Sequence, residues 1–133
     1  MATILQKHLL LAPGRPIRLS ATEENRVKTA LHHWKEARHY RTMGTTYDDV
    51  AAQLDVSKHA FNTYFTVHLQ EDFRTWRTRL RIEEAKTLLL HQRGLSASKI
   101  GEMVGFSNRS NFTNQFQRHV GCSPAQWREK HPE

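Results

Sequence analysis

The feature that most constrains the fold of this chain is an internal repeat that begins at residue 50. Residues of matching chemical type recur at an offset of 50, and then at an offset of 51 after one inserted residue. The first part of the repeat pairs Val50, Ala51, Leu54, Val56 and Ser57 with Ile100, Gly101, Val104, Phe106 and Ser107. The second part pairs Phe61, Phe65, His68, Leu69, Asp72, Trp76 and Arg77 with Phe112, Phe116, His119, Val120, Ser123, Trp127 and Arg128. Self-similarity at a nearly fixed spacing indicates two copies of one structural unit.

The second copy indicates what that unit is. Apolar residues over 100–104 have the spacing of a short amphipathic helix, and Gly105 is suited to ending it. Ser107 is the predicted cap of the next helix, on which Phe112 and Phe116 share one face. A short helix, a tight turn and a second helix with one apolar face are the parts of a helix-turn-helix.

The rest of the chain is predicted to be helical as well. We expect one helix from Ser20 to about Met43 and a linker helix over 73–92, with helix-turn-helix units over 45–70 and 97–130. No stretch alternates in the manner of a strand, so the predicted fold class is all-α. A helix of about 20 residues is about 30 Å long, close to one turn of B-DNA.

The amino-terminal residues differ from this pattern. Pro13, Gly14 and Pro16 exclude a continuous helix there, so we interpret residues 1–19 as an arm or linker and residues 20–133 as one domain.

Charge narrows the choice of partner. The net charge is +7, which favours a polyanion such as nucleic acid or an anionic membrane surface. The longest apolar run, Leu9 to Ala12, is far shorter than a membrane span, so no membrane contact is predicted within this chain. The single cysteine, Cys122, excludes a disulfide framework within one chain and fits a reducing cytoplasm.

The main alternative to a DNA-binding protein is an enzyme or a metal-binding protein. The sequence has no HExxH motif, no catalytic pair of carboxylates and no glycine-rich phosphate loop, so neither an enzyme nor a cofactor or metal site is predicted. A module that binds another protein through the same fold stays open as the second alternative. The two differ in salt dependence, because binding to duplex DNA releases counterions.

The second copy also resembles a known family. Ile100, the sequence Val104-Gly105-Phe106, Ser110, Phe112, Phe116, Gly121, Ser123-Pro124 and Trp127-Arg128 are similar to the pattern of the AraC/XylS family of bacterial transcription regulators. The resemblance covers roughly residues 45–130 and implies about seven helices, with two helix-turn-helix subdomains joined by a long central helix. It implies a cytoplasmic, sequence-specific regulator, usually an activator, that reads double-stranded DNA and contacts RNA polymerase. Family members commonly carry a separate sensing domain, so an upstream sensor domain, not in this chain, is a further candidate partner.

The resemblance also implies which residues meet DNA. The candidate base-contacting residues are His59, Asn62, Thr63, Arg109, Ser110, Asn111, Thr113 and Asn114. The candidate phosphate-contacting residues, at the helix N-termini, are Ser57, Lys58, Ser107 and Asn108. Two units of this kind predict a monomer that reads two adjacent major-groove segments.

Some positions depart from the family pattern. Gly101 stands where the family usually has alanine, and Asp55 stands where it usually has glycine. Many relatives have arginine or lysine at the positions of Thr63, Thr66, Asn114 and Gln117. We therefore expect recognition helices that are less basic than is usual for the family.

Overall fold

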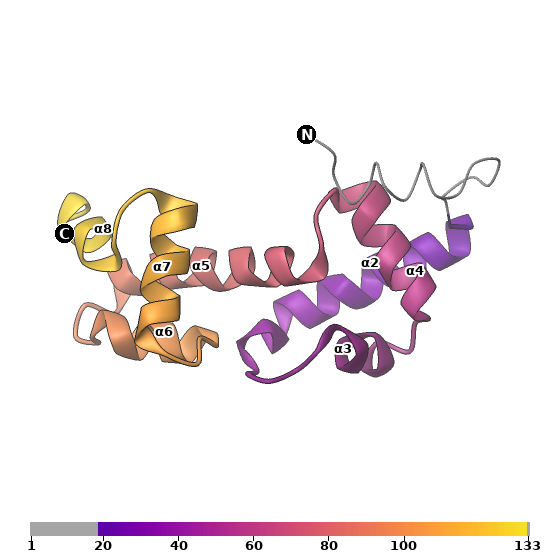
Figure 1. Ribbon diagram of the computed structural model, residues 1–133, viewed down its shortest axis with the longest axis horizontal. Coiled ribbons are helices and arrows are strands. Elements are labelled where there is room, and N and C mark those ends of the chain that lie inside the picture. Colours follow the sequence, from indigo (N-terminus) through magenta and orange to yellow (C-terminus); the bar gives the residue numbers. More distant parts are fainter. Residues whose placement is uncertain (1–18, 133) are drawn as a thin grey trace. The chain divides into compact units, whose positions relative to one another are not determined.

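All the regular secondary structure in the described part of the chain is helical. The computed structural model describes residues 19–132, which contain seven α-helices and no strand (Figure 1). The elements in chain order are α2 (Ala21–Glu36), η1 (His39–Arg41), α3 (Tyr47–Gln53), α4 (Lys58–Tyr64), η2 (Phe65–Leu69), α5 (Phe73–His91), α6 (Ala97–Val104), α7 (Arg109–Val120) and α8 (Pro124–Lys130). The all-α prediction is confirmed. The predicted arm lies, except for Leu19, outside the described residues.

The described chain forms two compact units. The first unit contains the residues up to Ala37 together with Thr45–Trp76, and the second contains Arg38–Gly44 together with the chain from Arg77 onward. Each unit holds one of the two predicted helix-turn-helix pairs: α3 with α4 in the first, and α6 with α7 in the second.

Side-chain caps begin helices in both units. Ser20 and Thr46 each form a reciprocal capping box with the residue three positions later. Helix α8 begins with a capping box at Ser123 and has Pro124 in its first turn. The predicted cap of α7 was wrong by one residue, because Asn108 rather than Ser107 accepts the backbone N–H of Asn111, at 2.8 Å.

The predicted first helix is too long by about seven residues. Helix α2 ends at Glu36, and Arg38 takes a left-handed conformation with φ of 59°. The guanidinium of Arg81 donates to the backbone carbonyls of Tyr40 and Thr42, at 2.6 and 3.1 Å. Those contacts fix residues 38–44 in the second unit, and this tertiary packing overrides the local helical pattern.

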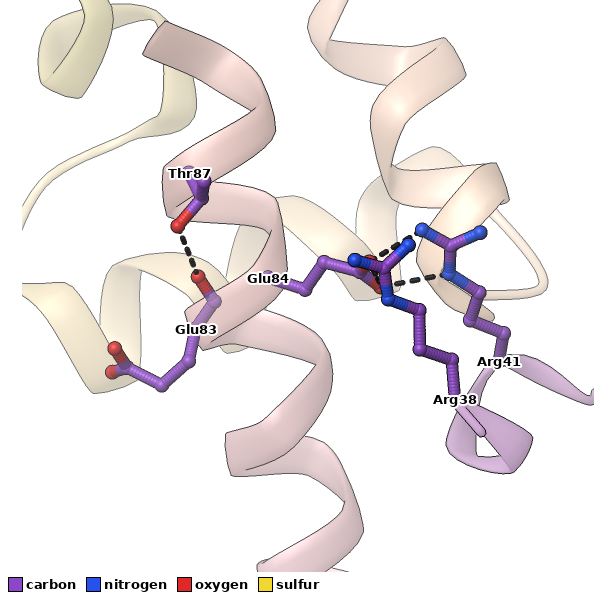
Figure 2. A network of polar contacts seen from close by, with 5 residues as sticks. All are labelled: Arg38, Arg41, Glu83, Glu84 and Thr87. Atoms are coloured by element: carbon purple, nitrogen blue, oxygen red, sulfur yellow. Dashed lines mark hydrogen bonds and ion pairs between the residues drawn. The ribbon is translucent and has the colours of Figure 1, made fainter. Parts of the chain in front are cut away.

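A carboxylate on α5 secures the same segment. The side chain of Glu84, only 9% exposed, pairs with Arg38 at 3.2 Å and accepts from Nε of Arg41 at 2.8 Å (Figure 2). A second hydrogen bond joins the Arg41 guanidinium to the other carboxylate oxygen, so the pairing is bidentate. Residues 38–44, Arg81 and Glu84, named here the α5 clamp, make the short linker part of the second unit.

The first unit has an aromatic core. Trp34 of α2 stacks on Trp76 with ring centroids 5.6 Å apart, and Phe65 packs edge-on against Trp76 at 5.4 Å. Phe61 and Phe73 fill the space beside them, at 5.4 Å from one another. Such contacts fix α4 and η2 against α2 and the start of α5.

The second unit has a mixed core. It is formed by Ile82, Ala85, Leu89, Ile100, Val104, Phe106, Phe112 and Phe116. A Cβ atom at Gly101 would lie 2.5 Å from ring atoms of Phe112, so glycine is what allows α6 and α7 to approach this closely. The departure of Gly101 from the family pattern therefore has a packing reason.

Two side chains of α8 form hydrogen bonds to the carboxyl-terminal end of α5. Arg128 donates to the carbonyls of Leu89 and Gln92, at 2.8 and 3.2 Å, and Trp127 donates to the carbonyl of Lys86 at 3.2 Å. The carbonyls of Leu89 and Gln92 lie in the last turn of α5 and just beyond it, where backbone carbonyls lack helical partners. The repeated Trp-Arg pair thus has a structural role in the second copy.

Candidate nucleic-acid interface

The turn before each recognition helix requires a left-handed residue. In the second unit this residue is Gly105, with φ of 116°. A Cβ atom there would lie 2.7 Å from Nε of Arg81 and 2.8 Å from the carbonyl oxygen of Arg41, so the turn is pressed against the α5 clamp. In the first unit Asp55 takes the same role with φ of 54°, and its carboxylate pairs with Arg26 at 3.3 Å on the surface.

Helix α7 presents a polar face opposite its buried phenylalanines. Phe112 and Phe116 are enclosed in the core, whereas Ser110, Asn111, Asn114, Gln117 and Arg118 are exposed. Their spacing of three, four and seven residues places these five on one side of the helix. We call this set the α7 face.

The α7 face contains three of the predicted base-contacting residues and two that the sequence reasoning omitted. Ser110, Asn111 and Asn114 were predicted, and Thr113 is half-buried at the margin. Gln117 and Arg118 follow Asn114 by three and four residues, so extending the helical period by one turn would have found them.

Arg109 lies apart from this face. It is the first residue of α7, is exposed, and helps to line a hollow of about 220 Å³ with Ser98, Glu102 and Asn108. The carboxylate of Glu102 lines the same hollow, so the local charge around Arg109 is mixed.

Helix α4 offers fewer accessible side chains. His59 is exposed and Asn62 is half-buried, but Thr63 is only 4% exposed. Thr63 was predicted to contact a base, and its buried side chain presents little surface to a base edge in a groove. Thr66, one turn later, is 6% exposed.

The predicted phosphate-contacting residues are already engaged to different degrees. Ser57 accepts the backbone N–H of Ala60 at 3.0 Å, and Lys58 pairs with Asp48 at 3.2 Å. Asn108 uses its side-chain oxygen as the cap of α7. Its side-chain NH₂ group can still donate to another acceptor, because the residue is exposed. Ser107 is exposed beside it.

The buried charge of the second unit belongs to Arg81, whose guanidinium is part of the α5 clamp. Burial, and then the nearby positive charge of Arg77, lower the pKa of Arg81 to about 10, so this guanidinium is still protonated at neutral pH. Within residues 19–132 no three His, Cys, Asp or Glu side chains come together as metal ligands. In the same range no helix is both long and apolar enough to cross a bilayer.

Comparison with known proteins agrees with this geometry. A family model described as a helix-turn-helix domain matches residues 50–130. Over 118 residues the chain is 30% identical to the raffinose operon transcriptional regulatory protein RafR of Pediococcus pentosaceus. The matched stretch covers 89% of this chain and 40% of RafR. Over 75 residues it is 35% identical to the HTH-type transcriptional regulator RipA of Corynebacterium diphtheriae. That stretch covers 56% of this chain and 22% of RipA.

A solved structure extends the similarity to the fold. The C-terminal domain of AraT, a response regulator from Geobacillus stearothermophilus, superimposes with a TM-score of 0.73 at 28% identity, covering 87% of this chain and 90% of that one. The chain spans less than half the length of the two regulators that it matches in sequence.

Proposed function

This chain belongs to the AraC/XylS family of helix-turn-helix transcription regulators, and from that premise we propose that it binds a specific site on duplex DNA and regulates transcription there. The observation that carries the proposal is the α7 face, an exposed polar surface on a helix whose other side is fixed in the core. A recognition helix needs this combination, because its side chains must meet base edges without rearranging the fold.

The residues divide into two roles within this proposal. Ser110, Asn111 and Asn114, with Thr113 at the margin of the α7 face, meet base edges under the second unit, and Arg109 is a further candidate at the start of α7. His59 and Asn62 are the accessible candidates under the first unit. Phosphate contacts come from Ser107, Asn108, Ser57 and Lys58, and from Arg118, which we add because it ends the α7 face. The net charge of +7 supports a polyanionic partner.

The finer parts of the proposal follow from family membership and from the repeat. Each unit has a helix-turn-helix pair, so we propose that one chain engages two neighbouring major-groove segments. Activation through contact with RNA polymerase, action in the cytoplasm and control by an upstream sensor domain are proposed because they are common in the family.

The salt dependence of binding to DNA tests the proposal. With a pool of random duplexes, log affinity is expected to fall linearly with log salt between about 50 and 200 mM, with a slope of about −0.9 for each phosphate contact. Replacing Arg118 with Gln is expected to reduce the slope by about 1. Lys130→Gln, which removes a positive charge from α8 outside the α7 face, is the matched control and is expected to change the slope less.

The alternative function predicts a different outcome. A module that docks a protein partner through the same fold would show no binding to any duplex, or binding that does not vary with salt. Either result would overturn the proposed function.

A further inference from the structure

The two recognition helices are equivalent in sequence but do not expose equivalent side chains. The repeat pairs Thr63 with Asn114 and Thr66 with Gln117. Thr63 and Thr66 are 4% and 6% exposed, whereas Asn114 and Gln117 lie on the exposed α7 face. Two outward positions of the repeat are therefore buried in α4 and in η2, which follows it, and are exposed in α7.

The exposed α7 face is rich in side-chain carboxamides. Asn111, Asn114 and Gln117 place three carboxamides on the α7 face, and the helix contains no aspartate or glutamate. Among the described residues none engages these three carboxamides in a hydrogen bond, so both the donor and the acceptor of each are available. A carboxamide pairs well with adenine, since it can donate to N7 and accept from N6 at the same time.

The spacing of the carboxamides suits a groove. Successive members are three residues apart, so the row from Asn111 to Gln117 extends about 9 Å along the helix axis. The major groove is about 12 Å wide and base pairs follow one another at about 3.4 Å. The row can therefore address two or more neighbouring base pairs.

The arginines of α7 are less suited to reading bases. Arg118 ends the α7 face and is assigned above to a phosphate, which its positive charge suits. Arg109 lines the hollow that it shares with Glu102, apart from the α7 face. Guanine recognition by arginine is thus a weaker expectation here than adenine recognition by carboxamides.

We propose that α7 is the base-reading helix of this chain, and that it selects an adenine-containing half-site through Asn111, Asn114 and Gln117 while α4 discriminates little between bases. This inference rests on the proposed function, because it presumes binding to duplex DNA. It adds the base identity and assigns the reading to one of two helices that the sequence makes equivalent.

Replacement of single atoms in the DNA tests the inference. A duplex is first selected from a random pool with the unaltered chain, and each adenine is then replaced in turn by 7-deazaadenine, which keeps the base pair but lacks the N7 acceptor. We expect one or more such replacements, all within one half of the site, to weaken binding by about 5- to 150-fold. The same replacement is expected to change binding by less than about twofold in Asn111→Ala or Asn114→Ala, because the contact is already absent.

Matched variants assign the effect to a helix. His59→Ala and Asn62→Ala are expected to keep the full sensitivity to 7-deazaadenine, since they alter the accessible residues of α4. Thermal unfolding of each variant, followed by circular dichroism, is expected to match that of the unaltered chain because the substituted side chains are not in the core.

Three results would overturn the inference. They are a selected site without adenine in either half, sensitivity to 7-deazaguanine in place of 7-deazaadenine, and loss of sensitivity in the α4 variants but not in the α7 variants. Failure to bind any duplex would instead overturn the proposed function, so the two failures are distinguishable.

Discussion

The two helix-turn-helix units have equivalent turns and recognition helices, but different residues and helix types form them. In the second unit Gly105 makes the turn and α7 continues as a regular helix of 12 residues. In the first unit Asp55 makes the turn, α4 ends after 7 residues, and one turn of π-helix, η2, follows it. Thr63 and Thr66 of the first unit are buried, whereas the equivalent Asn114 and Gln117 of the second are exposed, so a repeat in sequence need not expose the same surface.

The supports of the two units differ as well. The second unit is fixed by the α5 clamp, in which Glu84 is only 9% exposed. Two ion pairs of the first unit, Arg26 with Asp55 and Lys58 with Asp48, are mostly exposed and contribute little. The first unit depends instead on stacked aromatic rings such as Trp34 on Trp76.

The largest effect is expected from opening a cavity in either core. Phe112→Ala and Phe61→Ala are each expected to lower the free energy of unfolding by about 3–5 kcal/mol, because both side chains are fully buried. Urea denaturation followed by circular dichroism measures the change. An unchanged midpoint for either variant would show that its phenylalanine is not in the core.

A smaller effect is expected at the α5 clamp. Glu84→Ala removes the hydrogen bonds to Arg41 and the ion pair with Arg38, and is expected to cost about 1.5–3 kcal/mol. Asp48→Ala, which removes an exposed carboxylate from the first unit, is the matched control and is expected to have little effect on stability. Equal losses for the two variants, measured by denaturation, would contradict the difference in support between the units.

The turns provide a third contrast. Gly105→Ala is expected to cost about 1–3 kcal/mol, since the new methyl group meets Arg81 and the backbone of Arg41 in a left-handed conformation. Asp55→Gly is expected to change stability by less than about 1 kcal/mol, because relief of the left-handed strain is offset by the greater freedom of glycine when unfolded. Thermal unfolding of the pair measures both, and a larger effect at Asp55 than at Gly105 would reverse the comparison.

The smallest effect at neutral pH is expected at Tyr40. Burial, and then the charge of Glu84, raise the pKa of Tyr40 to about 12, against an ordinary value of about 10. The folded state therefore holds this proton more tightly, so its contribution to stability is complete below pH 10 and is lost as the pH rises towards 12.

Tyr40→Phe isolates that contribution. Stability measured against urea at several pH values above 9 is expected to fall less steeply with pH in the variant than in the unaltered chain. Identical slopes for the two proteins would contradict the assignment of the pKa shift to Tyr40.

Local signals in the sequence account for most of the fold. The start of the first helix after Ser20 and the end of α6 at the left-handed Gly105 are short-range features that the sequence predicts, and the structure confirms both. The end of α2 at Glu36 could not be predicted in this way, because it depends on Arg81 and Glu84 more than 40 residues later. The helical pattern continued across a segment that long-range contacts hold in another conformation.

The candidate site was predictable only in part for a similar reason. The helical period placed Asn111 and Asn114 on the outward side of α7, and the same period could have added Gln117 and Arg118. The same rule did not predict the burial of Thr63. Thr63 lies on the side of α4 away from Phe61 and Phe65, but other parts of the first unit cover it. Burial of a short polar side chain leaves no mark in the sequence.

A selection of bound sites from random duplexes tests the central claim most directly. The unaltered chain, Asn114→Ala and His59→Ala would each be used to select duplexes, and the base preference at every position would be compared. We predict that Asn114→Ala loses an adenine preference in one half of the site while His59→Ala keeps it, because α7 is open and α4 is enclosed. A preference that survives in Asn114→Ala and disappears in His59→Ala would contradict the account.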